Sequence, residues 1–472
     1  MRAGTAAIPA AVPALFRKAG ISARRSAMDA VKIRSMSMAT ARGPVQQLCE
    51  QLVRGEITPL AAAEEALARA NSNAGHNVYI ALDAERVREE ADALPSRFPH
   101  AAKPHLYGLP VSIKDCFDLA GFPTTLGSRF CAERNGVARE DSAVAARLRS
   151  QGAIIMGKTH MHPLAYGITG ENPDYGDCAQ PRDAGRLTGG SSSGAAASVK
   201  EQSAVAAIGT DTGGSVRVPA ALCGLAGYRA SVDLAQQRGL WRGGVHLAAT
   251  FDTLGWLFQD LRDAPLLTEA LFGLHVPDVT QTRFRVGCVS DEFLHDCDAQ
   301  VLAGFADWKQ RISDSGATMI PTDTGYWEEA FEIYAAITAH EAAAIHGAKT
   351  GGDFSHFPAA IAERLTWGAS ISAADIAQFR ARHSDFRARA DAQLREVDFF
   401  LAPCAALHAL AVGTDHTESR RAILRYTTPM SLVGAPVVTL PSASGAGVQL
   451  IAPRSSDARL LAYARAVGTR LA

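Results

Sequence analysis

From Pro44 onward, apolar and polar positions recur with the spacing of amphipathic helices, interrupted by short, wholly apolar runs. Thr58 followed by Pro59 predicts a helix start, because threonine caps helix N-termini and proline suits the first helical position. The first helix is therefore expected over residues 60–70, and a second, with glutamate and arginine on its solvated face, over 79–94. Further helices are predicted over 142–151, near 195–199, and over roughly 261–273, 298–315, 327–347 and 372–396.

The short apolar runs are typical of buried strands, because a strand covered on both faces has no polar alternation. Such runs occupy residues 109–113, 153–156, 204–208 and 399–401, and 437–440 with 448–451 resembles a closing strand pair. Strands that alternate with helices predict an α/β layered architecture around a mostly buried sheet. No internal repeat or low-complexity linker divides residues 44–472, which favours a single domain over this range.

Residues 1–43 differ from the rest of the chain. They hold eight Lys and Arg residues and one acidic residue, Asp29. We expect a disordered extension without a catalytic role. Its composition fits an organelle transit peptide better than a secretory signal. A plainer alternative is that Met1 lies upstream of the true start of translation, and that the folded protein begins near Ala41.

Composition indicates which partners the protein is expected to lack and in which cellular compartment it is expected to lie. Lys and Arg (47) balance Asp and Glu (48), so no basic footprint for nucleic acid stands out. No run reaches the about 18 apolar residues of a membrane span. Eight scattered cysteines without a CxxC pair indicate reduced, mostly buried thiols. These features predict a cytoplasmic protein with no nucleic-acid or membrane partner, organelle targeting of residues 1–43 remaining open.

Two motifs suggest a cofactor or a metal only superficially. Residues 152–159 satisfy the phosphate-loop pattern GxxxxGK[ST], but their Ala-Ile-Ile-Met centre predicts a strand rather than a loop that wraps an anion. His160 and His162 could begin a zinc site, yet no third ligand occurs at a recognisable spacing. Hydrogen-bonding histidines at a pocket rim are the simpler interpretation. We therefore expect neither a cofactor nor a bound metal.

Two glycine-serine clusters carry stronger chemistry: GGSSSG at 189–194 and DTGGSVRVPA at 211–220. Glycine lets backbone N–H groups approach a reacting carbonyl, and successive N–H groups in a tight loop form an oxyanion hole. A serine hydroxyl needs a base, and no histidine lies in either cluster. Lys114, at the end of a predicted buried strand, is the alternative base, because a desolvated lysine can lose its proton near neutral pH.

These clusters, together with GLPVSIKD at 108–115, closely resemble the amidase signature family. Flanking similarity extends the resemblance over about residues 44–470. It implies an α/β/α sandwich in which helices surround a large, mixed, twisted central sheet. Departures such as Thr188 and Ala195, where the family commonly has proline and serine, affect the scaffold around the first cluster.

The resemblance also implies site roles residue by residue. Ser215 corresponds to the nucleophile, and Ser191, usually on a cis peptide bond, bridges it to the base Lys114. The backbone N–H groups of Thr212, Gly213, Gly214 and Ser215 would form the oxyanion hole. Asp211 and Arg217 are expected to hold the nucleophile loop rather than contact substrate.

The implied activity is metal-independent hydrolysis of a small-molecule carboxamide through a serine acyl-enzyme. Ala165, Tyr166 and Gly167 fall where the family lines its acyl pocket. The glutaminase subunit of the tRNA-dependent amidotransferase is an alternative, but the aspartate that holds the glutamine amino group there corresponds to Leu424 here. Carbamate or ester hydrolysis and a catalytically inactive binding protein are further alternatives, and a homodimer is possible.

Overall fold

The computed structural model describes residues 42–279, 283–442 and 445–469. Nearly all of the predicted N-terminal extension lies outside these ranges, so its disorder stays a prediction. The first described helix, α2 (Pro44–Val53), begins where the extension was expected to end. Within the described ranges, every helix is too short or too polar to cross a membrane.

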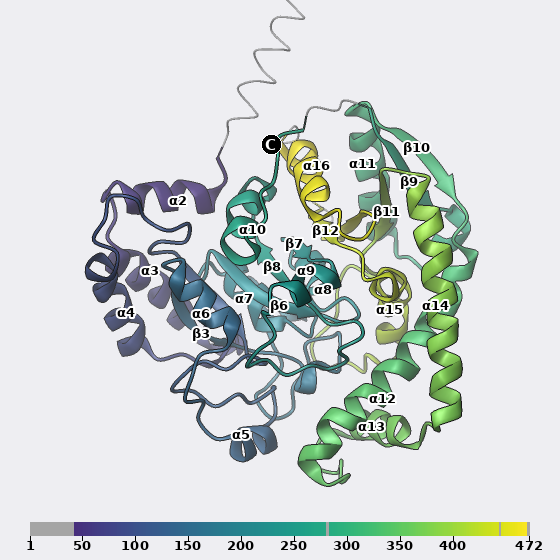
Figure 1. The fold of residues 1–472 in the computed structure, drawn as a ribbon, viewed down its shortest axis with the longest axis horizontal. Helices are drawn as coiled ribbons and strands as arrows, with labels where there is room; N and C mark the ends of the chain where they lie inside the picture. The colour runs from purple at the N-terminus through teal and green to yellow at the C-terminus, as the bar shows by residue number, and fades with distance from the viewer. Residues whose placement is uncertain (1–41, 280–282, 443–444, 470–472) are drawn as a thin grey trace, which may run out of the picture.

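A mixed sheet of eleven strands forms the centre of the described chain (Figure 1). Strand β2 (Pro110–Lys114) pairs in parallel with both β3 (Ile154–Thr159) and β6 (Ala206–Asp211). From β6 onward the pairs are antiparallel as far as β13 (Val448–Ile451). In sheet order the strands are β1 (Tyr79–Ala81), β3 (Ile154–Thr159), β2 (Pro110–Lys114), β6 (Ala206–Asp211), β8 (Thr253–Phe258), β7 (Ala226–Arg229), β12 (Val437–Leu440), β13 (Val448–Ile451), β11 (Phe399–Pro403), β9 (Arg285–Val289) and β10 (Thr318–Thr322). A separate pair joins β4 (Ala179–Gln180) and β5 (Asp183–Leu187).

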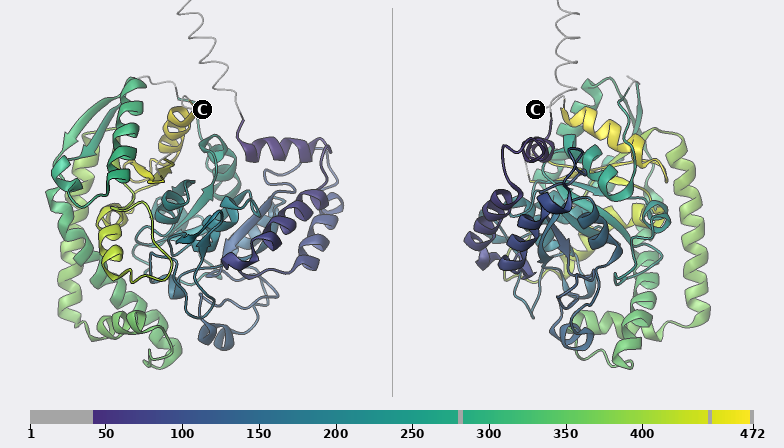
Figure 2. Two further views of the ribbon diagram at one scale, coloured as in Figure 1. Left: turned by 180° about the vertical axis from the view of Figure 1, so that it is seen from behind. Right: turned by 60° about the vertical axis from the view of Figure 1, so that its left-hand side comes forward.

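Helices surround this sheet in all three views (Figures 1 and 2). The first half of the chain contributes α2, α3 (Pro59–Ser72), α4 (Ala84–Arg97), α5 (Arg129–Asn135), α6 (Ala143–Ser150), α7 (Ser193–Lys200), α8 (Arg217–Leu222) and α9 (Val232–Gln237). The second half contributes α10 (Ala264–Phe272), α11 (Ala299–Asp314), α12 (Ala330–Thr350), α13 (Ala359–Ser370), α14 (Ala373–Arg395), α15 (Thr417–Val433) and α16 (Asp457–Thr469). The predicted fold class is thereby confirmed.

One predicted helix, over 79–94, is wrong at its N-terminal end. Residues Tyr79–Ala81 form β1, which pairs with β3 in an antiparallel way. Helix α4 begins only at Ala84, because the Asp83 side chain accepts a hydrogen bond from the Arg86 backbone N–H and caps the helix there. Residues 79–81, which the pattern assigned to the helix, therefore form a strand at the edge of the sheet.

The GxxxxGK[ST] segment is a strand, as predicted. Residues Ile154–Thr159 form β3, and all six are buried. Lys158 lies within this strand and pairs with the buried Asp115 at 2.7 Å. Its charge is therefore used inside the core rather than in an anion-binding loop.

The parallel pairing of β2 with β6 brings two distant parts of the chain to one edge of the sheet. Val111 lies beside Ala206, and Ile113 beside Ile208. Lys114 ends β2 and Asp211 ends β6. The carboxyl ends of parallel strands meet at the same edge, so the strand-end lysine and the second glycine-serine cluster become neighbours.

Candidate active site

Lys114 is completely buried at the end of β2, although lysine is normally among the most exposed residues. Its Nζ donates hydrogen bonds to Ser191 Oγ at 2.7 Å and to Thr210 Oγ1 at 2.8 Å. Burial disfavours the charged form and lowers the pKa of Lys114 to about 8, against the opposing attraction of Asp252 and Asp211. Lys114 can therefore release its proton near neutral pH.

Ser191 follows a cis peptide bond from Gly190, as the family resemblance implied. Backbone hydrogen bonds hold this loop on both sides of the serine: Gly190 donates to the Ile168 carbonyl at 2.8 Å, and His162 donates to the Ser191 carbonyl at 3.2 Å. Ser192 donates its backbone N–H to the Ser215 carbonyl at 3.2 Å. The two glycine-serine clusters are thus joined directly.

The carboxylate of Asp211 organises the loop that carries Ser215. It accepts hydrogen bonds from the backbone N–H groups of Gly214 at 2.9 Å and Val216 at 3.1 Å. It also pairs with the buried guanidinium groups of Arg217 at 2.9 Å and Arg229 at 3.2 Å. Burial alone would raise the pKa of Asp211, but the two guanidinium groups outweigh it and hold that pKa below its ordinary value. The predicted loop-holding role of Asp211 and Arg217 agrees with these contacts.

The residues predicted to form the oxyanion hole lie in this loop, under close packing. A Cβ atom at Gly213 would meet Tyr334 Oη at 2.5 Å, so only glycine fits there without a shift of the tyrosine. The Thr212 side chain is held by Asp252, its Oγ1 donating to the carboxylate at 2.6 Å. Because the Gly214 N–H already donates to Asp211, three of the four predicted donors remain for an anion: Thr212, Gly213 and Ser215.

The predicted relay is only half formed in this structure. Lys114 donates to Ser191, but the Ser215 hydroxyl has no hydrogen-bond partner among the described residues. Ser215 Oγ is therefore available to a molecule that enters the site. Catalytic hydrogen bonds are often long or unmade before substrate binds, so this geometry is compatible with the predicted role.

Ser215 opens onto a cavity of about 10 Å³, roughly the space that one water molecule needs. The three residues predicted to line the acyl pocket, Ala165, Tyr166 and Gly167, do line this cavity. Its remaining walls come from both glycine-rich and helical parts of the chain: Ile168, Gly213, Leu247, Tyr334, Arg420 and Leu424. Two larger cavities of about 660 and 370 Å³ lie beside it, and Arg420 lines all three.

Four residues at or beside the site were not singled out from the sequence. Thr210 contacts Lys114, Tyr334 packs against Gly213, and Arg364 and Arg420 flank the Tyr166 wall. Thr210 carried a weak signal, as the residue before the DTGGS motif at the end of a predicted buried segment. Tyr334 lies in a predicted helix, whereas no helix was predicted over the segments that hold Arg364 and Arg420, and only the fold brings these three residues to the site.

The paired histidines are hydrogen-bonding or buried groups near the pocket. His160 Nε2 lies 2.8 Å from the Gly176 carbonyl, and burial lowers the pKa of His160 to about 4. His162 lines the 370 Å³ cavity, and burial holds its pKa well below the ordinary value. In the part of the chain that the structure describes, no three His, Cys, Asp or Glu side chains cluster in a way that could hold a metal ion.

Comparison with known proteins identifies the family to which the chain belongs. The family model described as Amidase matches residues 61–461. The chain is 31% identical to 2-amino-5-chloromuconic acid deaminase of Comamonas testosteroni, covering 82% of this chain and 87% of the relative. It is 28% identical to a glutamyl-tRNA(Gln) amidotransferase subunit of Koribacter versatilis, covering 88% of this chain and 96% of the relative.

A solved structure agrees in three dimensions. The crystal structure of an amidase superimposes with a TM-score of 0.82 at 32% identity, covering 91% of this chain and all of the other. The match includes the segments that carry Lys114, Ser191 and Ser215, since all three lie within residues 61–461. The chain therefore belongs to the amidase (amidase-signature) family, a family of enzymes that act on amide C–N bonds.

Proposed function

We propose that this protein hydrolyses a small-molecule carboxamide through an acyl-enzyme on Ser215. Neutral Lys114 accepts a proton from Ser191, which in turn accepts one from Ser215 as its Oγ attacks the amide carbonyl. The backbone N–H groups of Thr212, Gly213 and Ser215 stabilise the developing oxyanion. The relay returns a proton to the leaving ammonia or amine, and water then releases the acid.

One observation carries this proposal: the contact of a desolvated lysine with the cis-bonded serine. Lys114 is fully buried, its pKa lies near 8, and its Nζ is 2.7 Å from Ser191 Oγ. A lysine that only stabilised the fold would be expected to pair with a carboxylate, as Lys158 does with Asp115. Lys114 instead contacts two hydroxyl groups, which suits proton transfer.

The glutaminase subunit of an amidotransferase is the second candidate, because several curated relatives are amidotransferase subunits. Leu424 disfavours it. This leucine lines the cavity of Ser215, and a glutamine amino group placed against it would lose its hydration without gaining a carboxylate partner. Glutamine hydrolysis that appears only with partner subunits and tRNA would instead support this candidate.

The test is turnover of a panel of amides, carbamates and esters by the purified protein and by variants of its serines. Ser215→Ala and Ser191→Ala should each abolish turnover, and a fluorophosphonate probe should label Ser215 in the unmodified protein. Ser192→Ala is the matched control, because this buried hydroxyl contacts the Thr210 carbonyl at 3.3 Å rather than Lys114. Absence of labelling in a correctly folded protein would favour a binding protein instead.

A further inference from the structure

Two arginines flank the entrance to the Ser215 cavity from helices far apart in sequence. Arg364 lies on α13 and Arg420 on α15. Arg420 lines the Ser215 cavity and both larger cavities beside it, and Arg364 lines the two larger ones. Both guanidinium groups therefore border the space next to the Ser215 cavity, and that of Arg420 borders the Ser215 cavity itself.

Neither guanidinium has an acidic partner among the described residues. Arg364 donates to the Tyr166 carbonyl at 2.8 Å and lies 4.7 Å from the centre of the Tyr166 ring. Arg420 lies 6.0 Å from the centre of the Phe331 ring. The Nε atoms of both arginines are buried without a hydrogen-bond partner. The two side chains thus retain donors with nothing in the structure to receive them.

Burial of two positive charges together without an anion is unfavourable. Burial and then the nearby Arg420 charge lower the pKa of Arg364 to about 10, so the position of this arginine is electrostatically unfavourable. The acidic side chains that line the larger cavities are engaged elsewhere: Glu328 with Arg425, Glu332 with Arg382, Glu171 with Thr169, Asp177 with Asn172 and Asp415 with Thr417. Among the described residues, the acidic side chains that line these cavities therefore leave Arg364 and Arg420 without a bonded carboxylate.

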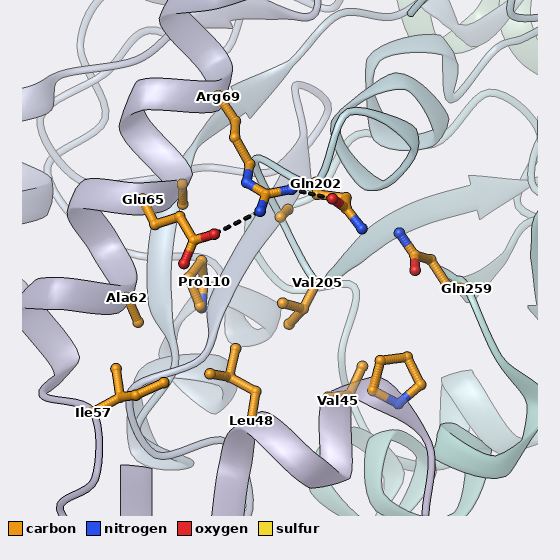
Figure 3. Close-up of a pocket in the computed structure, with 13 residues that line it drawn as sticks. Val45, Leu48, Ile57, Ala62, Glu65, Arg69, Pro110, Gln202, Val205 and Gln259 are labelled. Atoms are coloured by element: carbon orange, nitrogen blue, oxygen red, sulfur yellow. Dashed lines mark hydrogen bonds and ion pairs between the residues drawn. The ribbon is translucent and has the colours of Figure 1, made fainter. Parts of the chain in front are cut away.

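A cavity elsewhere in the molecule shows the contrast. It measures about 200 Å³ and lies among α2, α3 and β2, with an apolar floor that includes Val45 and Leu48 (Figure 3). Its one arginine, Arg69, bonds to Glu65 at 2.5 Å and to Gln202. The charge at that cavity is already neutralised, whereas the charge beside Ser215 is not.

The wall beside this positive charge is apolar. Leu424, one helical turn after Arg420 on α15, faces the same small cavity as Ser215. The site therefore offers donors for an anion, whereas no carboxylate among the described residues lines the Ser215 cavity to receive an ammonium group. A substrate that carries both groups, as an α-amino acid does, would find a partner for only one of them.

We propose that Arg364 and Arg420 bind a carboxylate carried by the amide substrate, so that the enzyme takes an acidic amide without an α-ammonium group. This inference rests on the proposed hydrolysis at Ser215 and names its substrate class. Charge-assisted hydrogen bonds from arginine to carboxylate are shorter and stronger than neutral ones, and paired donors fix the orientation of the carboxylate. The carboxylate would thereby place the amide carbonyl against Ser215.

The test compares the monoamides of malonic, succinic and glutaric acids with propionamide, butyramide and pentanamide, which lack the carboxylate. At least one acidic amide should have a kcat/KM about tenfold to a hundredfold above that of its neutral match, from the usual strength of charged hydrogen bonds. Arg420→Met should remove this preference, so that the ratio of kcat/KM for an acidic amide to that for its neutral match falls toward one. Arg421→Met is the matched control, because Arg421 lines only the 660 Å³ cavity.

Binding separates failure of this inference from failure of the proposed function. Malonate, succinate or glutarate should bind to Ser215→Ala in calorimetry, and more weakly to the same variant with Arg420→Met, whether or not any amide is hydrolysed. Equal binding to both variants, no binding, or equal turnover of acidic and neutral amides would overturn the inference. Loss of all amide turnover with intact dicarboxylate binding would overturn only the proposed function.

Discussion

Replacement of Thr210 by valine tests the electrostatic state of Lys114 directly. The Thr210 hydroxyl accepts a hydrogen bond from Lys114 Nζ at 2.8 Å, and valine keeps the shape of threonine while removing that acceptor. A hydrogen bond from a charged donor contributes about 1.5–3 kcal/mol and a neutral one about 0.5–1.5 kcal/mol. The ammonium form of Lys114 therefore loses about 1.4 kcal/mol more than the neutral form, which is about one pKa unit.

The sign of the effect follows from which form is active. The neutral amine is the proposed base, so kcat/KM should rise with pH through the Lys114 pKa of about 8. Thr210→Val lowers this pKa further, and the rising limb should move toward about pH 7. At pH 7 the neutral fraction of Lys114 would increase about fivefold, while the plateau at high pH should fall as the amine loses a positioning contact.

The assay is the pH profile of kcat/KM for one amide, measured for the unmodified protein, Thr210→Val and Thr210→Ser. The serine variant keeps an acceptor oxygen, so its rising limb should stay near that of the unmodified protein. A limb that does not move in Thr210→Val, or that moves to higher pH, would refute the reasoning. It would mean that Lys114 is not the group whose ionisation the profile reports.

Two further changes probe the nucleophile loop. Asp211→Asn removes the negative charge that compensates the buried Arg217 and Arg229. It should lower the free energy of unfolding, measured by denaturant titration, by about 3–5 kcal/mol. A change below about 1 kcal/mol would contradict the central role of that carboxylate. Gly213→Ala should lower kcat by at least about tenfold and destabilise the fold by about 1–3 kcal/mol, because its Cβ would meet Tyr334 Oη at 2.5 Å. Unchanged kcat in Gly213→Ala would show that this backbone position does not contribute to the reaction.

The presence of buried strands could be predicted from the sequence, but their order in the sheet could not. Apolar runs identify buried strands, and residues 109–113 and 204–208 fall close to β2 and β6. Nothing local in those runs states that the two strands pair in parallel, since pairing depends on contacts between segments about 95 residues apart. The meeting of Lys114 with the second glycine-serine cluster could therefore be inferred only through the family resemblance.

Helix α15 shows a different limit. It spans Thr417–Val433 and contains Pro429, a residue that breaks most helices, so its sequence does not present a simple helical pattern. Tertiary packing compensates, because every residue from Tyr426 to Val433 is buried. The helix brings Arg420 and Leu424 to the site. From sequence, Leu424 could be placed there only through the family resemblance, and Arg420 could not be placed at all.

The proposed serine chemistry could be inferred from the sequence because the residue types it needs are constrained within short segments. Glycine is required at Gly213 by the closeness of Tyr334, and at Gly214 by a φ of 130°. Such requirements are visible in the sequence as glycines at fixed positions of a short motif. Arg364 and Arg420 leave none, since an arginine on a helix usually lies at a solvated surface and acquires a site only through the fold.

The proposed reaction and the proposed selectivity for a carboxylate therefore depend on different stretches of this chain. Lys114, Ser191 and Ser215 come from the strands and loops between residues 110 and 220, whereas Arg364, Arg420 and their neighbours come from the helices α12 to α15. The first stretch is locked into the core by Asp211 and its two arginines, so it tolerates little change. The helices nevertheless contact the nucleophile loop, since Tyr334 on α12 packs against Gly213 and Arg217 donates to the Thr427 carbonyl on α15. Single substitutions at Arg364 and Arg420, rather than exchange of whole helices, are therefore the natural way to redirect the enzyme between acidic and neutral amides.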